Sequence, residues 1–305
     1  MPTAPADSAY GTALVPTVTP FSNGSVDVEA VADLCEFVLA NGADGLVPCG
    51  TTGEFASLTE EEYETVVAAS VDAADGAPVL PGAAATSVAD TLDRIDIAAD
   101  CGADAVLIVL PYFHGQNAPG GNERFVRAVL AETSLPIILY NIPSCVGQSI
   151  DADLVEAVAD HPDLVGMKDT SGDLTHLLDI IHRTDDDFHL FQGYDSQLVP
   201  AMSMGATGGI NALTNVFPGV VSDAIDSATG DADDFAHARD LQLDHLGPFF
   251  GECLEYGFAP ATKTALVARG VIDDDTVRPP LVQLGDDATA SVCTAVDRVV
   301  DAVGE

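Results

Sequence analysis

Short apolar runs alternate with longer amphipathic stretches along most of the chain. Eight runs of four to six residues are typical of buried strands, and apolar residues recur with helical spacing between them. The predicted strands are residues 13–18, 45–48, 79–82, 105–110, 136–140, 164–168, 189–192 and 208–212. The predicted helices are residues 28–40, 60–73, 88–101, 122–132, 152–160, 174–183, 197–204 and 219–228. Thr59 and Glu62, three residues apart, predict a capping box at the start of the second helix.

Eight strand–helix units in succession predict an α/β fold with a parallel sheet, and eight is the number that closes a (β/α)8 TIM barrel. The alternative is an open doubly wound sheet, which usually carries a glycine-rich phosphate loop after its first strand. Here residues 17–22 read TVTPFS, and the glycines of 205–209 lack the GxGxxG spacing. The pattern therefore favours the barrel.

Beyond residue 229 the strand pattern stops. Residues 231–246, 260–270 and 289–303 have helical spacing of their apolar positions. We therefore predict a catalytic barrel domain over residues 1–228 and a C-terminal helical appendage over residues 229–305 that packs on it.

The net charge of the chain excludes some classes of binding partner. The 305 residues are 47% apolar, enough for a sizeable core, but 10 Lys and Arg face 49 Asp and Glu, giving a net charge of −39. Nucleic-acid binding needs a basic patch, so the composition excludes it, and it argues equally against an anionic membrane. Such a charge repels itself in dilute buffer and is screened in molar salt. We therefore predict a salt-adapted protein.

The chain shows no signal peptide and no apolar run of membrane-spanning length, which predicts a cytoplasmic location. Its six cysteines are scattered, with no CxxC pair, and its seven histidines form no HxH or HExxH motif. These spacings predict neither a disulfide framework nor a metal site. We expect no cofactor.

Lysine occurs only at positions 168 and 263. Lys263 falls on a predicted helix of the appendage, where a solvated or ion-paired role is expected. Lys168 ends the sixth predicted strand, and in a barrel the carboxyl ends of the strands build the active site. An amine desolvated there can attack a carbonyl group as a nucleophile. The alternative is an ion pair with a carboxylate such as Asp169.

Two other groups fall at strand ends. Tyr140 ends the fifth predicted strand, where its hydroxyl could move a proton beside Lys168. The segment GTTGE at 50–54 follows the second strand and offers backbone and hydroxyl donors suited to a carboxylate. Each feature alone is also compatible with an ordinary barrel residue or turn, but the three together indicate a site.

Four ordered motifs are similar to a known superfamily. GTTGE at 50–54, YNIP at 140–143, GMKDTSGD at 166–173 and GATGGIN at 205–211 resemble the dihydrodipicolinate synthase and N-acetylneuraminate lyase superfamily. The resemblance spans residues 12–228 and implies class I, Schiff-base aldolases on a TIM barrel. A protonated imine stabilises the carbanion formed on bond cleavage, so this chemistry requires no metal.

Roles follow from the resemblance residue by residue. It implies that Lys168 forms an imine with pyruvate, that Thr51 and Thr52 hold the pyruvyl carboxylate, and that Tyr140 shuttles a proton. It further implies that backbone groups of Gly193 and Ile210 line the site. Tyr112 falls where the family places an aromatic side chain near the pocket, sometimes across a subunit interface. A homotetramer built from dimers is expected on the same basis.

Departures from the motifs bear on the second substrate. Synthases of this superfamily carry an arginine at the position of Cys145 and a tyrosine at that of Phe113, and both differences count against the lysine-pathway reaction. Thr51 counts against neuraminate lyases. The segments 168–176, 193–195 and 214–218 look similar to archaeal 2-keto-3-deoxygluconate aldolases, in which an acid at the position of Asp195 can bind sugar hydroxyls.

We therefore predict a lyase that reversibly cleaves 2-keto-3-deoxygluconate or its 6-phosphate into pyruvate and glyceraldehyde or its 3-phosphate. Arg124 and Arg127 are the candidates for a phosphate, although a solvated helix face suits both better. The alternatives are a 4-hydroxy-tetrahydrodipicolinate synthase, a related dehydratase of keto-deoxy sugar acids and, more remotely, a non-catalytic barrel that binds a keto acid.

Overall fold

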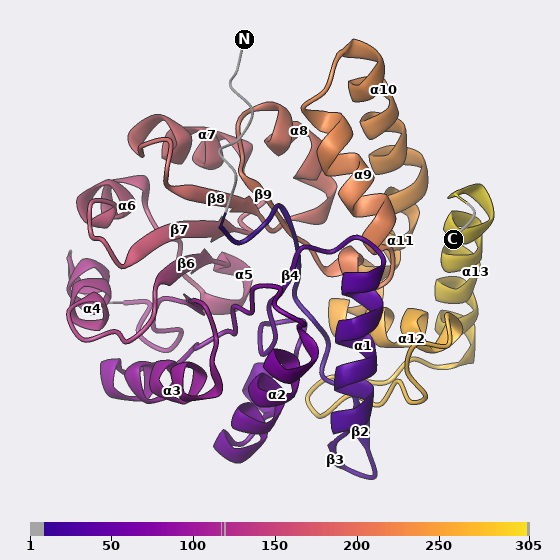
Figure 1. The fold of residues 1–305 in the computed structure, drawn as a ribbon, viewed down its shortest axis with the longest axis horizontal. Helices are drawn as coiled ribbons and strands as arrows, with labels where there is room; N and C mark the ends of the chain where they lie inside the picture. The colour runs from indigo at the N-terminus through magenta and orange to yellow at the C-terminus, as the bar shows by residue number, and fades with distance from the viewer. Residues whose placement is uncertain (1–8, 117, 119, 304–305) are drawn as a thin grey trace.

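The structure, a computed structural model, describes residues 9–116, 118 and 120–303. Short parallel strands curl around its centre and helices surround them (Figure 1). Seven strands pair in the order β4-β1-β9-β8-β7-β6-β5, and each coincides with a predicted strand. They are β1 Ala13–Val15, β4 Gly45–Leu46, β5 Val106–Ile108, β6 Ile137–Asn141, β7 Leu164–Asp169, β8 His189–Gln192 and β9 Gly208–Ile210.

The predicted strand at 79–82 joins the two edges of this sheet. Val79 forms a parallel bridge with Leu46 of β4, and Gly82 forms one with Leu107 of β5. Backbone N–H groups at 80 and 83 donate to the carbonyls of Leu46 and Leu107, each over 2.8 Å. Pro78 and Pro81 flank and interrupt this segment, and proline has no N–H to donate, so only isolated bridges form. The sheet nevertheless closes as the predicted TIM barrel.

Eight helices follow the barrel strands, as predicted. They are α1 Val28–Ala40, α2 Glu60–Ala73, α3 Val88–Cys101, α4 Gly121–Leu130, α6 Ala152–Val158, α7 Leu174–Arg183, α8 Leu198–Ser203 and α9 Pro218–Ala228. The capping box of α2 is confirmed, since Thr59 and Glu62 exchange side-chain and backbone hydrogen bonds of 3.0 and 3.2 Å. No helix among the described residues is long and apolar enough to cross a membrane.

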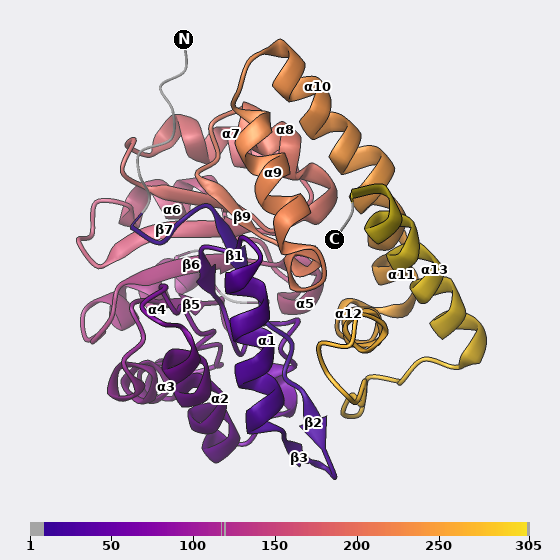
Figure 2. The same cartoon turned by 45° about the vertical axis from the view of Figure 1, so that its right-hand side comes forward.

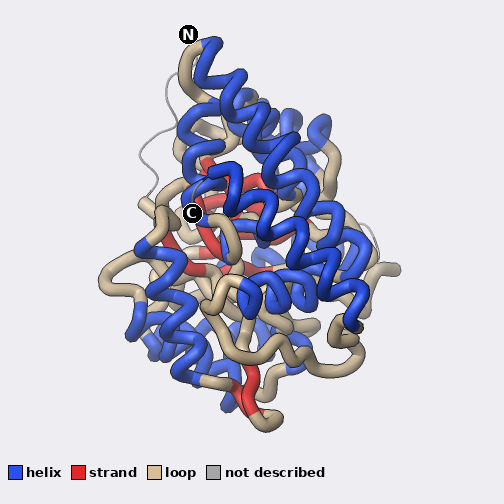
Figure 3. Tube along the Cα trace, turned by 90° about the vertical axis from the view of Figure 1, so that its right-hand side faces the viewer, coloured by secondary structure: helices blue, strands red, loops and turns tan. Residues whose placement is uncertain are grey.

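Several short elements were not predicted. β2 Phe21–Ser22 and β3 Ser25–Val26 form a hairpin that projects from one end of the molecule (Figure 3). Its turn is Asn23-Gly24, with φ of +52° and +84°, and an Asn-Gly pair is the sequence signal that could have revealed it. Single-turn helices also follow the barrel strands: η1 Phe55–Ser57, α5 Pro143–Val146, η2 Asp195–Gln197 and η3 Ala212–Asn215.

The C-terminal helices lie together against one side of the barrel (Figure 2). They are α10 Ala232–Asp240, the π-helical η4 Leu241–Leu246, α11 Gly247–Tyr256, α12 Phe258–Ala268 and α13 Asp286–Val303. α11 was missed because its Gly-Pro start is typical of a chain break. Buried Phe249, Leu266 and Val296 belong to the same hydrophobic cluster as the barrel strands. The domain division at 228 stays a prediction, and residues 1–8 of the first domain lie outside the described residues.

Candidate active site

The carboxyl ends of β6 and β7 place a tyrosine and a lysine side by side. Tyr140 and Lys168 are paired in register on these strands, and both are buried, with 7% and 5% of their surface exposed. Lys168 Nζ lies 4.2 Å from the centre of the Tyr140 ring. Residues opposite each other on neighbouring strands point to the same face of a sheet, so both side chains enter the same space. The two predicted catalytic residues are thus brought together.

Asp169, which follows Lys168, is occupied by other partners. Its carboxylate accepts hydrogen bonds from Asn141 Nδ2 over 2.9 Å and from Ser171 Oγ over 3.0 Å. His176 Nδ1 lies 3.2 Å from its second oxygen. No ion pair found among the described residues includes Lys168, so the alternative of a Lys168–Asp169 pair is wrong. Asp169 instead fastens the ends of β6 and β7 to each other.

Because Gly193 has no side chain, the aliphatic part of the Lys168 side chain can pack directly against it. A Cβ atom built on Gly193 would lie 2.7 Å from Lys168 Cε and 2.1 Å from Thr170 Oγ1. Real Cβ atoms do not approach so closely, and the nearer contact is with a hydroxyl that is itself buried. Any side chain at this position would therefore displace Lys168 from its place beside Tyr140.

The loop after β4 carries the two predicted carboxylate-binding threonines. Thr51 is exposed toward a cavity, whereas Thr52 beside it is buried. Cys49 and Glu54 flank them, each with a φ of +56°. Residues other than glycine rarely adopt this left-handed conformation, which costs on the order of 1–3 kcal/mol and concentrates at functional sites. The surrounding structure must therefore hold this loop in place.

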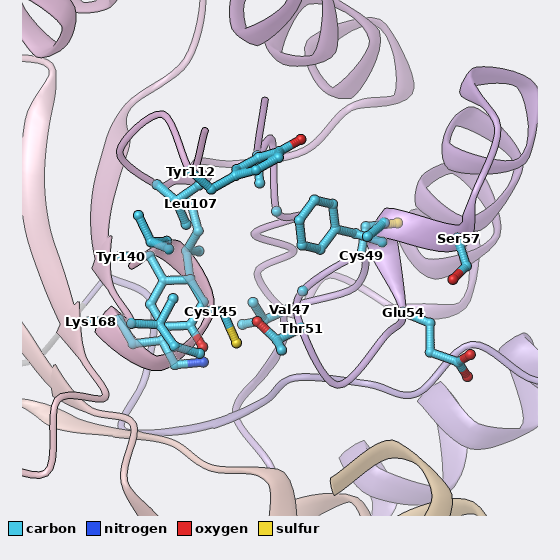
Figure 4. A pocket seen from close by; sticks show the side chains of 18 of the residues that line it. Val47, Cys49, Thr51, Glu54, Ser57, Leu107, Tyr112, Tyr140, Cys145 and Lys168 are labelled. Carbon is cyan, nitrogen blue, oxygen red and sulfur yellow. The ribbon is translucent and has the colours of Figure 1, made fainter. Parts of the chain in front are cut away.

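A cavity of about 300 Å³ opens over these residues. In Figure 4 the polar ends of Lys168, Tyr140, Thr51 and Cys145 turn toward one part of it. Among the described residues that line the cavity, Lys168 alone is a lysine or arginine. The rest of the wall is largely apolar: Val47, Phe55, Ala84, Leu107, Val109, Ile142, Val146, Pro280 and Leu281. The lining offers one amine, a few hydroxyl groups, two thiols and the carboxylate of Glu54 within a largely apolar enclosure.

The predicted substrate-binding residues divide into two groups. Thr51 and Tyr112 line the cavity together with Lys168 and Tyr140. Thr52, Gly193, Asp195 and Ile210 are not among the lining residues, and they lie behind it as buried positions or close neighbours of Lys168.

Asp195, predicted to meet sugar hydroxyls, is buried and accepts a hydrogen bond of 2.9 Å from the backbone N–H of Leu213. Burial raises its pKa to about 6, although the backbone donors and the positive charge of Lys168 act in the opposite direction. The carboxylate is therefore held against the backbone after β9, away from the cavity lining.

The positions of some site residues could not be predicted from the sequence. Pro280 and Leu281 come from the segment between α12 and α13, and only the folded chain shows that they form part of the cavity wall. Glu54 belongs to the GTTGE motif, but its partner on α12 could not be inferred from spacing. Within the described residues, no cluster of three or more His, Cys, Asp or Glu side chains could hold a metal ion.

Comparison with known proteins decides the family. The model of the dihydrodipicolinate synthetase family matches residues 9–299. The chain belongs to this family. A 4-hydroxy-tetrahydrodipicolinate synthase from Syntrophus aciditrophicus is 35% identical over 273 residues, which cover 89% of this chain and 92% of that protein. Another from Methanoculleus marisnigri is 40% identical over 207 residues, covering 66% and 70%.

Solved structures of the family agree with this assignment. The crystal structure of dihydrodipicolinate synthase from Aquifex aeolicus superposes with a TM-score of 0.89 at 30% identity, covering 95% of this chain and 98% of that one. As a member of the dihydrodipicolinate synthetase family, the protein is a lyase of the Schiff-base aldolase type.

Proposed function

We propose that Lys168 forms the Schiff base with pyruvate and that Tyr140 moves the proton during carbon–carbon bond cleavage or formation. The observation that carries this proposal is the buried stacking of Lys168 Nζ 4.2 Å over the Tyr140 ring, at the mouth of a barrel of this family. Thr51, which lines the same cavity, supplies a hydroxyl donor for the pyruvyl carboxylate.

The proposed reaction uses only groups of this site. The neutral amine of Lys168 attacks the 2-keto carbon, water leaves, and a protonated imine forms. The imine withdraws the electron pair when the C3–C4 bond breaks, leaving an enamine of pyruvate. The proton released by the C4 hydroxyl passes through the Tyr140 oxygen as the aldehyde departs. Tyr140 then returns this proton to C3 of the enamine, which regenerates the protonated imine, and hydrolysis of that imine releases pyruvate and the free amine.

The cavity wall supports an aldehyde that carries no carboxylate. A carboxylate buried here would find no arginine or lysine other than Lys168, since Cys145 stands on the wall and the neighbouring residues are apolar. Burying an unpaired charge is costly. The same argument disfavours a phosphate, because Arg127 is exposed on α4 and paired with Glu123 over 2.7 Å, and Arg124 is exposed on the same helix. We therefore propose cleavage of an unphosphorylated 2-keto-3-deoxy sugar acid such as 2-keto-3-deoxygluconate.

The second candidate is the 4-hydroxy-tetrahydrodipicolinate synthase reaction, in which pyruvate condenses with aspartate semialdehyde. The names of the relatives favour it over the sugar acid, since proteins 33–40% identical to this chain carry that name. Under this alternative another group must hold the carboxylate of the semialdehyde.

A two-step experiment tests both candidates. Borohydride reduction in the presence of pyruvate should leave a stable adduct on Lys168, found by peptide mass spectrometry and absent from Lys168→Ala. Steady-state rates with 2-keto-3-deoxygluconate, its 6-phosphate and aspartate semialdehyde should then favour the first. An absent adduct would refute the Schiff-base assignment, and faster semialdehyde condensation would establish the second candidate.

We also propose that the protein assembles as a homotetramer and is located in the cytoplasm. Tyr112, which lines the cavity, is 42% exposed, and the adjacent Phe113 is 87% exposed; aromatic surface of this kind is usually covered. A second copy of the chain would cover it. Light scattering of the purified protein would show whether a tetramer forms.

A further inference from the structure

Lys263, the other lysine of the chain, is fully buried on α12. Its Nζ lies 2.5 Å from Glu54 Oε1 and donates to the carbonyl of Thr276 over 2.8 Å. The same nitrogen lies 4.2 Å from the centre of the Phe21 ring. Burial lowers the pKa of Lys263 and the charge of Glu54 raises it, so the amine and its carboxylate depend on each other. Of the two expected roles, the ion-paired one is correct.

Glu54 receives a second tie from the segment that follows α12. Its Oε2 accepts the backbone N–H of Arg278 over 3.0 Å. The guanidinium of Arg278 binds both oxygens of Glu62 over 2.6 and 2.7 Å, and the carbonyl of Ser57 over 2.8 Å. This interaction also lowers the pKa of Glu62 to about 2. Residues of the C-terminal region therefore form hydrogen bonds with both ends of the segment from Glu54 to Glu62.

The segment from Glu54 to Glu62 directly follows the turn that contains Thr51 and Thr52. The backbone N–H of Glu54 donates to the carbonyl of Thr51 over 3.2 Å, and that of Phe55 donates to Gly50 over 3.3 Å. Glu54 itself has the left-handed φ of +56°. In Figure 4 its carboxylate points away from Lys168 and Tyr140. Glu54 thus faces the appendage while its backbone closes the turn that presents Thr51.

Stability alone does not explain a pair of charges in this position. Both side chains are fully removed from solvent, and replacing such a pair by apolar groups of similar volume is often neutral for stability. The pair instead fixes the position of the Glu54 side chain, because two charge-assisted hydrogen bonds hold its carboxylate between α12 and the backbone of Arg278. An apolar pair would leave the turn free to shift against α12.

We propose that Lys263 and Glu54 are positioning residues for pyruvate, which hold the Thr51-Thr52 turn at the distance from Lys168 that the pyruvyl carboxylate requires. The C-terminal helices are then part of the substrate-binding machinery. This inference rests on the proposed function, because it assumes that pyruvate reacts at Lys168 and meets the threonine turn.

The test compares pyruvate affinity with reactivity. The double variant Glu54→Leu with Lys263→Met removes both charges and leaves no unpaired one. In the variant that still melts cooperatively, the pyruvate concentration for half-maximal borohydride trapping of Lys168 should rise at least about tenfold, the cost of a lost charged hydrogen bond. The maximal trapping rate should change less than about threefold, because Lys168 and Tyr140 keep their places.

The matched control is Arg183→Met. Arg183 also binds carboxylates, those of Asp153, Glu156 and Asp179, but at the end of α7 that leads to the amino end of β8. Its loss should leave the half-maximal pyruvate concentration unchanged. If the double variant does not fold, Glu54→Gln with Lys263→Met replaces it, because it also leaves no buried charge and keeps an acceptor for the Arg278 N–H, and the same direction of change is expected.

An unchanged half-maximal concentration in a folded variant, with normal wild-type trapping, would overturn the positioning role alone. A wild-type protein that traps no pyruvate would overturn the proposed function together with it. An equal rise in the Arg183→Met control would show a general loss of integrity and would also overturn the positioning role.

Discussion

Lys168 Nζ stands over the face of the Tyr140 ring, 4.2 Å from its centre, and the two residues are paired across neighbouring strands. An aromatic face attracts a cation by about 0.5–2 kcal/mol, so the ring provides a place for the lysine end without a carboxylate partner. The amine is thereby held where a carbonyl compound can reach it, so the Tyr140 ring positions Lys168 in addition to the proton transfer that we propose for its hydroxyl.

Tyr140→Phe separates these two roles. The phenyl ring keeps the place for Lys168, whereas the missing hydroxyl removes the proton relay. We expect borohydride trapping of pyruvate to persist and kcat for cleavage to fall by about 10²–10⁴, the usual contribution of a general acid or base. Tyr140→Leu, which lacks the ring as well, should lose trapping too. Equal turnover in wild type and Tyr140→Phe would exclude Tyr140 from proton transfer.

Cys145→Arg tests the choice of aldehyde. The thiol lines the cavity, and an arginine there would give a carboxylate a charged partner worth about 1.5–3 kcal/mol. We expect kcat/KM for aspartate semialdehyde to rise at least about tenfold and that for the sugar acid to fall. Cys145→Met supplies similar bulk without charge. If both variants behave alike, the charge at this position does not select the substrate.

His176 is predicted to be protonated in the folded protein. Its Nδ1 lies 3.2 Å from Asp169 Oδ2 and its Nε2 lies 2.8 Å from the carbonyl of Ile150, so both nitrogens face acceptors and both must donate. The hydrogen bond to Asp169 raises the pKa of His176 above its usual 6.5, burial opposes it, and the charges of Asp169 and Asp173 raise it further. Nitrogen NMR of labelled histidine should show that His176 keeps both ring protons to a higher pH in the folded protein than in the unfolded chain.

The raised pKa of His176 makes the unfolding free energy of the protein depend on pH. A proton bound more tightly in the folded state stabilises it fully below pH 6.5, and the benefit is lost as the pH rises through the pKa of the folded protein. The unfolding free energy of wild type should exceed that of His176→Gln by on the order of 1 kcal/mol below pH 6.5, and the difference should narrow as the pH rises through the raised pKa of the folded protein. His182→Gln, exposed on the same helix, serves as control. A gap that widens with pH would contradict the assignment.

Salt should stabilise this protein strongly. With a net charge of −39, repulsion among carboxylates opposes folding when the screening length is about 10 Å, and this repulsion largely disappears at about 3 Å in molar salt. We expect the melting temperature to rise by more than about 5 °C between 0.1 and 2 M KCl. Sucrose at matched osmolality controls for surface exclusion. A melting temperature independent of KCl would refute the proposed salt adaptation.

Most of the barrel could be predicted from the chain because buried parallel strands are continuous apolar runs followed by amphipathic helices. The segment at 79–82 was also predicted, but its bridging role depends on prolines and on two distant strands. α11 was missed since Gly247-Pro248 has the local chemistry of a helix break, and packing against the barrel overrides it.

The candidate active site likewise contains residues that could be predicted from local sequence and residues that could not. Lys168, Tyr140 and Thr51 could be found because each stands at a strand end, and strand ends meet at one face of a barrel. Asp195 has a similar place in the sequence, yet its carboxylate turns to the Leu213 N–H, a choice made by the chain after β9. The contact of Glu54 with Lys263 spans 209 positions, and no local pattern records it.

Both lysines of the chain are inside the fold, at 5% and 0% exposure. Reagents that acylate primary amines on protein surfaces should therefore leave the folded side chains nearly untouched. Of the two lysine side chains, the one that a small carbonyl probe can reach under native conditions is Lys168 in the cavity, so modification of lysine side chains reports on the candidate active site. Coupling chemistries that target lysine side chains would need a lysine added to the surface of this protein.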